Sequence, residues 1–203
     1  MSKANQRRLE CLHEAGHAVM SWIHSVRIIE IRLVPDHEGG ELGATTSMEF
    51  PGPTSEYWKP DDIIAHMRIA LAGPRAEQLG PAPVSAAERE HAKWDRNQHR
   101  LKAVGYAKQF GGGRIDDASI PILAVSAEKD VDEVFNKTVV IRSVTALASE
   151  LLRREAILGP DAEAFIASRI TEQQRNALQE CCVTRSRTTS ASAASETQSD
   201  EHQ

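Results

Sequence analysis

The chain is poor in several features that define broad protein classes. Only 4% of its 203 residues are aromatic, and only three are cysteines: Cys11, Cys181 and Cys182. An odd number of cysteines that includes an adjacent pair argues against a disulfide framework and favours a reducing compartment. No apolar run approaches the roughly 18–20 residues that span a bilayer, and the N-terminus lacks the apolar core of a signal peptide. These absences predict a cytoplasmic protein without membrane segments.

An excess of basic charge is also missing. Lys and Arg number 24 against 29 Asp and Glu, which gives a net charge of −5, and no dense basic stripe occurs. A nucleic-acid partner is therefore not expected. Hydrophobic residues make up 40% and charged residues 26% of the chain, which is an ordinary globular composition. The length predicts one domain with some residues left over.

The spacing of apolar residues predicts a mostly α, α+β domain over residues 1–170 with a small β-hairpin. Apolar positions recur every three to four residues in the helical stretches and alternate in the two strands. Gly39-Gly40 lies between the strands, where a hairpin turn is expected. The expected helices are 4–24, one that begins at Pro60, 85–110, 126–158 and 160–168, and the expected strands are 27–35 and 42–50.

Glycine and proline mark several expected boundaries. The pair Gly73-Pro74 predicts that the second helix ends there or continues, kinked, to Leu79. Gly159 is expected just past the end of the long helix, where glycine commonly adopts the left-handed conformation. Residues 171–203 are expected to hold a helix remnant followed by a disordered tail rich in Ser, Thr and Ala.

One motif near the N-terminus carries recognisable chemistry. Residues 13–17 read His-Glu-Ala-Gly-His, an H-E-x-x-H pattern on a predicted helix. Residues four apart lie on one face of a helix, so His13 and His17 can bind the same metal ion. Glu14 is rotated by about 100° from His13 and can take a proton from a water whose pKa the metal lowers to about 7. The motif predicts a zinc site with a general base.

A catalytic zinc needs a third protein ligand and an open fourth position. The metzincin pattern requires Gly at position 20 and His at position 23, which are Met20 and Ile23 here. His24 lies about 10 Å along the helix from His17, too far to share the ion. The third ligand must therefore come from another segment of the chain.

Further segments follow the motif in a characteristic order. These are Leu71-Ala72-Gly73 with Arg75-Ala76-Glu77, then Asp95, Phe110-Gly111, and finally 147–152 with Glu155, Gly159 and Phe165. Together with the motif, they resemble the peptidase domain of the FtsH-type zinc metalloproteases, peptidase family M41, over roughly residues 8–168. The resemblance implies a zincin-type helical peptidase domain.

The resemblance also implies the remaining site residue. In that family an aspartate at the start of the helix leading to the aromatic-Gly pair binds zinc, and Asp95 stands at the matching position. The implied site is thus His13, His17 and Asp95 around Zn²⁺, with Glu14 as the catalytic residue.

Three further side chains are candidates for the third ligand in place of Asp95. His91 and His99 lie four residues to either side of Asp95 on the same helix face, and Glu77 is a further carboxylate. In the resembled family, the stretch that contains Glu77 packs behind the site. Glu77 is accordingly interpreted as structural.

The implied function is a zinc metalloendopeptidase that hydrolyses unfolded or flexible polypeptides through a zinc-activated water. The edge of the strand 42–50 is expected to receive an extended substrate, unless it is an edge strand that binds nothing. Two more classes stay open: a catalytically inactive adaptor or regulatory protein of the same fold, and an unrelated helical protein with a chance motif. Retention of Glu14 argues against loss of catalysis, because a structural metal site has no use for a base.

Two departures from the family pattern are visible. The family normally carries an AAA ATPase module, but no G-x-x-x-x-G-K-[ST] loop occurs in this sequence. The segment 85–94 also lacks the Gly-rich approach usual before the aspartate. A separate ATPase or unfoldase partner and a homo-oligomer are both left open, and no membrane partner is expected.

Overall fold

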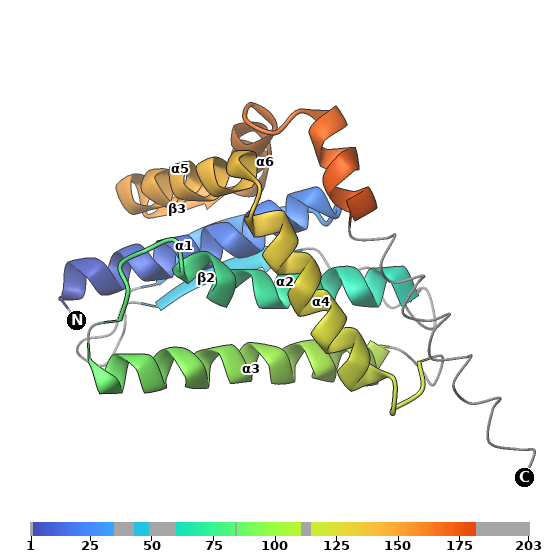
Figure 1. Ribbon diagram of the computed structural model, residues 1–203. Coiled ribbons are helices and arrows are strands. Elements are labelled where there is room, and N and C mark those ends of the chain that lie inside the picture. The colour runs from blue at the N-terminus through green and yellow to red at the C-terminus, as the bar shows by residue number, and fades with distance from the viewer. Residues whose placement is uncertain (1, 35–42, 49–59, 84, 111–114, 182–203) are drawn as a thin grey trace, which may run out of the picture.

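The computed structural model describes residues 2–34, 43–48, 60–83, 85–110 and 115–181 (Figure 1). Most of them are helical, and a small antiparallel sheet accompanies the helices, which confirms the predicted fold class. The elements are α1 (Lys3–Ile23), β1 (Ile28–Val34), β2 (Gly43–Met48), α2 (Pro60–Glu77), α3 (Ala86–Phe110), α4 (Ile120–Phe135), α5 (Thr138–Arg154), β3 (Ala156–Leu158) and α6 (Gly159–Ala167). A further helical segment, 172–181, follows, and the tail predicted to be disordered from Val183 onward lies outside the described residues.

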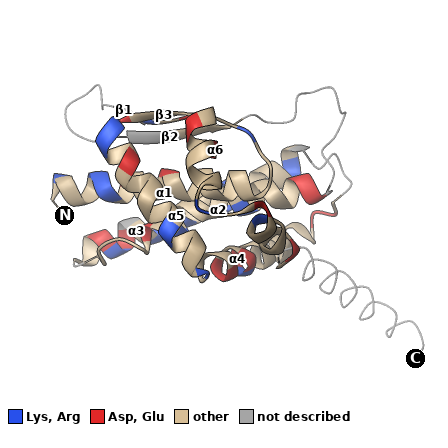
Figure 2. Cartoon of the chain, turned by 90° about the horizontal axis from the view of Figure 1, so that it is seen from above, with Lys and Arg blue, Asp and Glu red and all other residues tan. Residues whose placement is uncertain are grey.

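Helix α1 runs through the middle of the molecule. It packs against α2, which in turn packs against α3, while α5 covers another side of α1 (Figure 1). Seen from above, the sheet lies along one side of α1 (Figure 2). The second half of α1, from Cys11 to Ile23, is almost entirely buried because neighbours surround it. Side chains on this half of α1 can therefore meet groups from several elements.

The predicted hairpin is part of a three-stranded sheet. Strand β1 pairs antiparallel with β2, with Ile31 opposite Thr46, and on its other side with β3, where Ile31 faces Ile157. The order β2-β1-β3 leaves β2 at one edge of the described sheet. The expected turn at Gly39-Gly40 lies outside the described residues.

The expectation of one helix over 126–158 is wrong. Helix α4 ends at Phe135, Lys137 is extended with φ −81° and ψ 124°, and α5 begins at Thr138 in a new direction. Periodicity alone missed this break because Val134 and Ile141 preserve the helical spacing across it. The last three residues of the predicted helix form β3 instead.

Gly159 has a different role from the predicted one. The left-handed residue after α5 is Glu155, with φ 66°. Gly159 instead begins α6 against β1, where an added Cβ would lie 1.8 Å from the carbonyl oxygen of Ile28. The absence of a side chain therefore allows α6 to approach the sheet. The helix predicted at 160–168 is confirmed as α6.

We expect Gly159→Ala to lower the free energy of unfolding by about 1–3 kcal/mol, since the new methyl group overlaps main-chain atoms that cannot rotate away. Gly105→Ala is the matched control: Gly105 lies inside α3 with nothing within 4 Å of the added Cβ. That variant should gain up to about 1 kcal/mol from helix propensity. Urea unfolding of both variants checks the difference, and equal midpoints would contradict the close-contact role.

Candidate metal centre

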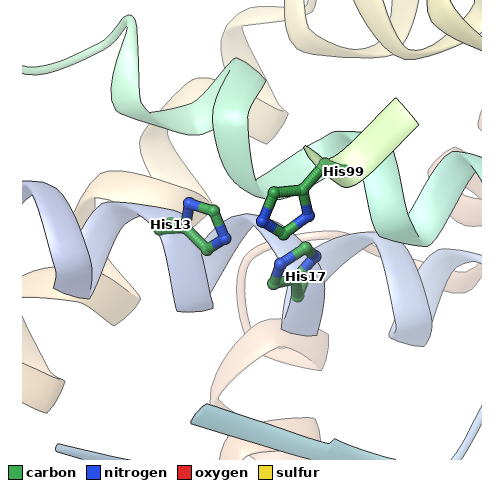
Figure 3. A group of neighbouring side chains, drawn as sticks. All are labelled: His13, His17 and His99. Carbon is green, nitrogen blue, oxygen red and sulfur yellow. The ribbon is translucent and has the colours of Figure 1, made fainter. Parts of the chain in front are cut away.

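Helix α1 presents the two histidines of the motif one turn apart. The ring centroids of His13 and His17 are 4.7 Å apart, and both rings face α2 and α3 (Figure 3). His17 is buried and His13 is partly buried. The spacing-based prediction that one helix face brings these imidazoles together is met by this geometry.

A third imidazole, that of His99, joins them from α3 (Figure 3). Its ring centroid lies 4.7 Å from that of His13 and 5.4 Å from that of His17. One nitrogen from each of the three rings lies within 4.8 Å of the others. The three histidines therefore form a compact group of possible ligands for one metal ion.

Helix α2 orients all three rings through their Nδ1 atoms. His13 Nδ1 is 2.6 Å from Glu77 Oε1, His17 Nδ1 is 2.7 Å from the carbonyl oxygen of Ile69, and His99 Nδ1 is 2.9 Å from that of Ala70. Metal-binding histidines commonly donate one N–H to such an acceptor, which leaves the other nitrogen for the metal. The arrangement thus frees Nε2 of each ring.

Pro74 explains why one of these carbonyls is available. Helix α2 continues through Gly73 and Pro74 to Glu77, so the second helix continues past this pair rather than ending at it. Proline has no N–H, and therefore the carbonyl oxygen of Ala70, four residues earlier, loses its usual helical donor. The imidazole of His99 donates to that oxygen instead.

Gly73 provides space beside the histidines. A Cβ added to Gly73 would lie 2.5 Å from Nε2 of His13 and 2.5 Å from Nε2 of His17. Any larger residue would thus occupy the space next to both free nitrogens. Neutral imidazole nitrogens grouped around such a space fit zinc, which binds histidine at about 2.0–2.1 Å.

The predicted third ligand, Asp95, lies next to this group. Its Oδ1 atom is 3.8 Å from Nε2 of His99, and its Oδ2 atom is buried without a hydrogen-bond partner among the described residues. Asp95 also forms a second possible ligand group with His13 and Glu77. Coordination by Asp95 remains a prediction.

The carboxylate of Glu77 contacts Nδ1 of His13 and so orients that ring. Glu77 also belongs to the possible ligand group with His13 and Asp95, and its structural role stays a prediction. The side chain of His91, which sequence spacing also allows as a ligand, lies outside the described residues.

Glu14 faces the same cavity as the histidines. The cavity has a volume of about 400 Å³. Its lining comes from α1, α2, α3 and β2: His13, Glu14, His17, Thr46, Met48, His66, Ile69, Ala70, His99, Lys102 and Tyr106. The Thr46 hydroxyl donates a 3.1 Å hydrogen bond to the main-chain oxygen of Glu14, which ties the edge strand to the motif. A carboxylate, four imidazoles and an edge strand therefore share one cavity.

Burial shifts the protonation of these groups in different directions. It lowers the pKa of His17 well below its usual value and that of His99 to about 4, so both are neutral near pH 7. For His13, burial lowers the pKa, but the hydrogen bond and charge of Glu77 outweigh it and the pKa is raised. Burial raises the pKa of Glu14 despite the opposing charge of His13. Neutral His17 and His99 can offer lone pairs without first losing a proton.

Sequence reasoning missed three polar residues of the cavity: His66, Lys102 and Tyr106. A signal was present for two of them. Asp95, His99, Lys102 and Tyr106 are spaced i, i+4, i+7 and i+11, which places them along one stripe of α3. A stripe of polar residues on a helix that packs against other helices indicates a cavity with polar walls. No comparable spacing in the sequence marked His66 on α2.

A comparison with known proteins finds a distant similarity to one FtsH-type zinc metalloprotease. The chain is 23% identical over 170 residues to ATP-dependent zinc metalloprotease FtsH 2 of Thermoanaerobacter sp. (strain X514). The match covers 79% of this chain and 32% of the relative, so the chain corresponds to about a third of that protein's length. No protein-family model matches the chain. This identity indicates a distant relationship to a metalloprotease and leaves the residue roles to be tested.

No helix in the described ranges has the length and apolarity needed to cross a bilayer.

We expect the purified protein to hold about one zinc per chain and His17→Ala to hold close to none. A catalytic zinc site has three protein ligands, and this substitution leaves only two. Zinc is measured by elemental analysis after gel filtration. His24→Gln is the matched control, since His24 caps the same helix but lies outside the histidine group. Equal zinc in His17→Ala and wild type would exclude this site.

Proposed function

We propose that the chain is a zinc metalloendopeptidase that cleaves unfolded or flexible polypeptides. The observation that carries the proposal is the shared cavity: His13, His17 and Glu14 of the H-E-x-x-H helix face it together. The distant similarity to a zinc metalloprotease supports the same function. His13 and His17 would hold the ion, with α3 supplying the third ligand, since Asp95 and His99 both lie beside them.

Glu14 is the proposed base. A bound zinc ion would supply Lewis acidity, which lowers the pKa of a water molecule and polarises the substrate carbonyl. Glu14 takes a proton from the attacking water while the oxygen of that water bonds to the carbonyl carbon of the substrate. It then gives that proton to the amine nitrogen as the C–N bond breaks. Glu14 directly follows His13, so its side chain leaves the helix about 100° around the axis from that of His13. Its carboxylate can therefore line the cavity without acting as a ligand, which leaves it available for proton transfer.

Strand β2 is the proposed docking edge for substrate. It lies at the edge of the described sheet, and its residues Thr46 and Met48 line the cavity. An extended peptide that pairs with β2 would place its own backbone beside the histidines. Main-chain hydrogen bonds bind many sequences with similar affinity, which suits a protease with broad substrates.

We expect Glu14→Gln to reduce peptide hydrolysis by at least about 100-fold while zinc content stays at the wild-type level, because the amide keeps the shape of the side chain but cannot accept the proton. Cleavage of a fluorogenic peptide library measures the loss. Glu10→Gln is the matched control, one turn earlier on α1 and outside the cavity lining. Wild-type activity in Glu14→Gln would refute the role of the base, and absence of activity in wild type with full zinc would favour a binding protein.

A second expectation concerns the state of the substrate. Pairing with β2 needs about four to six residues of extended chain, which a folded domain releases only by local unfolding. The purified chain should therefore cleave casein but not a stable folded domain, and added ATP should change neither rate. Gel analysis of both substrates with and without ATP checks this. Cleavage of the folded domain would contradict it, whereas activity that appears only with an added ATPase would point to a two-component protease.

A further inference from the structure

We propose that His99 is itself a ligand of the metal centre, so that three imidazoles, those of His13, His17 and His99, hold the ion. The inference rests on the zinc site of the proposed function and specifies how α3 completes it. It also departs from the two-histidine, one-aspartate arrangement that the family resemblance implies.

The hydrogen bonds determine which nitrogen of each ring is free. A carbonyl oxygen can only accept a hydrogen bond, so the rings of His17 and His99 carry their protons on Nδ1, bonded to Ile69 and Ala70. In a neutral imidazole, Nε2 then holds a lone pair. His13 is oriented in the same sense by the carboxylate of Glu77. The rings of His17 and His99 thus offer Nε2 as an acceptor, and the ring of His13 does so once its Nε2 carries no proton.

The ligand nitrogens of the three rings lie close together. One ligand nitrogen from each ring lies within 4.8 Å of the other two, and no donor from the described part of the chain is bonded to any Nε2. Three imidazoles directed into one cavity form the donor set that zinc takes from histidine. A cation among the three nitrogens would bind all of them.

Asp95 provides a second observation that favours a cation at this position. Its Oδ2 is buried with no partner in the described ranges, and its Oδ1 lies 3.8 Å from Nε2 of His99. That distance is too long for a hydrogen bond, and both atoms are acceptors, so the two side chains do not satisfy each other. A positive ion beside His99 would interact favourably with Nε2 of His99 and with the carboxylate of Asp95.

The orientation of His99 depends on the proline of α2. Pro74 leaves the carbonyl oxygen of Ala70 without its helical donor, and His99 Nδ1 occupies that position at 2.9 Å. The side chain of His99 is only 8% exposed, so few other rotamers are open to it. Its Nε2 is consequently held toward the α1 histidines before any ion binds.

The first test is zinc affinity, measured by competition with a chromophoric chelator. His99→Ala should bind zinc more than about 100-fold more weakly than wild type, since even outer residues around a metal typically contribute 10- to 100-fold. Leu101→Ala is the control because Leu101 lies on the same helix with 63% exposure. Affinity of His99→Ala within threefold of wild type, in protein with an unchanged circular dichroism spectrum, would overturn the proposal.

The second test separates a ligand from a nearby supporting residue. In His99→Cys loaded with Co²⁺, a thiolate at position 99 should give a sulfur-to-cobalt charge-transfer absorption that wild type lacks. Leu101→Cys adds the same group at an exposed position and should show no new absorption. A folded His99→Cys that binds cobalt without the new absorption would overturn the proposal. Because the readout is spectroscopic, it stands apart from the hydrolysis test of Glu14, and the proposal can fail while zinc-dependent proteolysis is retained.

Discussion

At Gly16 and Gly73, helices α1 and α2 approach each other closely because neither position carries a Cβ. A Cβ on Gly16 would lie 2.6 Å from the carbonyl oxygen of Ala72, and one on Gly73 would lie 2.5 Å from two imidazole nitrogens. This close approach lets histidines on α1 reach acceptors on α2. The geometry of the candidate metal centre therefore depends on two helices packing at nearly backbone contact.

Helix α2 acts as the support of the site although it supplies none of the three histidines. Its acceptors, the Glu77 carboxylate and the main-chain oxygens of Ile69 and Ala70, each hold one ring. A regular helix would use the carbonyl of Ala70 internally, and Pro74 is what leaves it for His99. A residue that usually disrupts helices here contributes to the orientation of a side chain on a different helix.

The cavity brings together chemistry from elements that are distant in the sequence. Helix α1 contributes the two motif histidines and Glu14, α3 contributes His99, and β2 forms one wall. An edge strand beside the candidate metal centre would give an extended chain a route to His13, His17 and Glu14. The proposed peptidase function follows from this combination, and the distant similarity to FtsH 2 is consistent with it.

The sequence by itself determined the parts of this protein that depend on local spacing. His13, Glu14 and His17 are placed by the geometry of one helix, and the fold class follows from periodicities read over short windows. The inclusion of His99 in the cluster was decided only by tertiary structure, because it depends on the packing of α3 against α2. The break between α4 and α5 and the addition of β3 to the sheet were likewise decided by packing, since burial against distant segments overrides a continuous helical pattern.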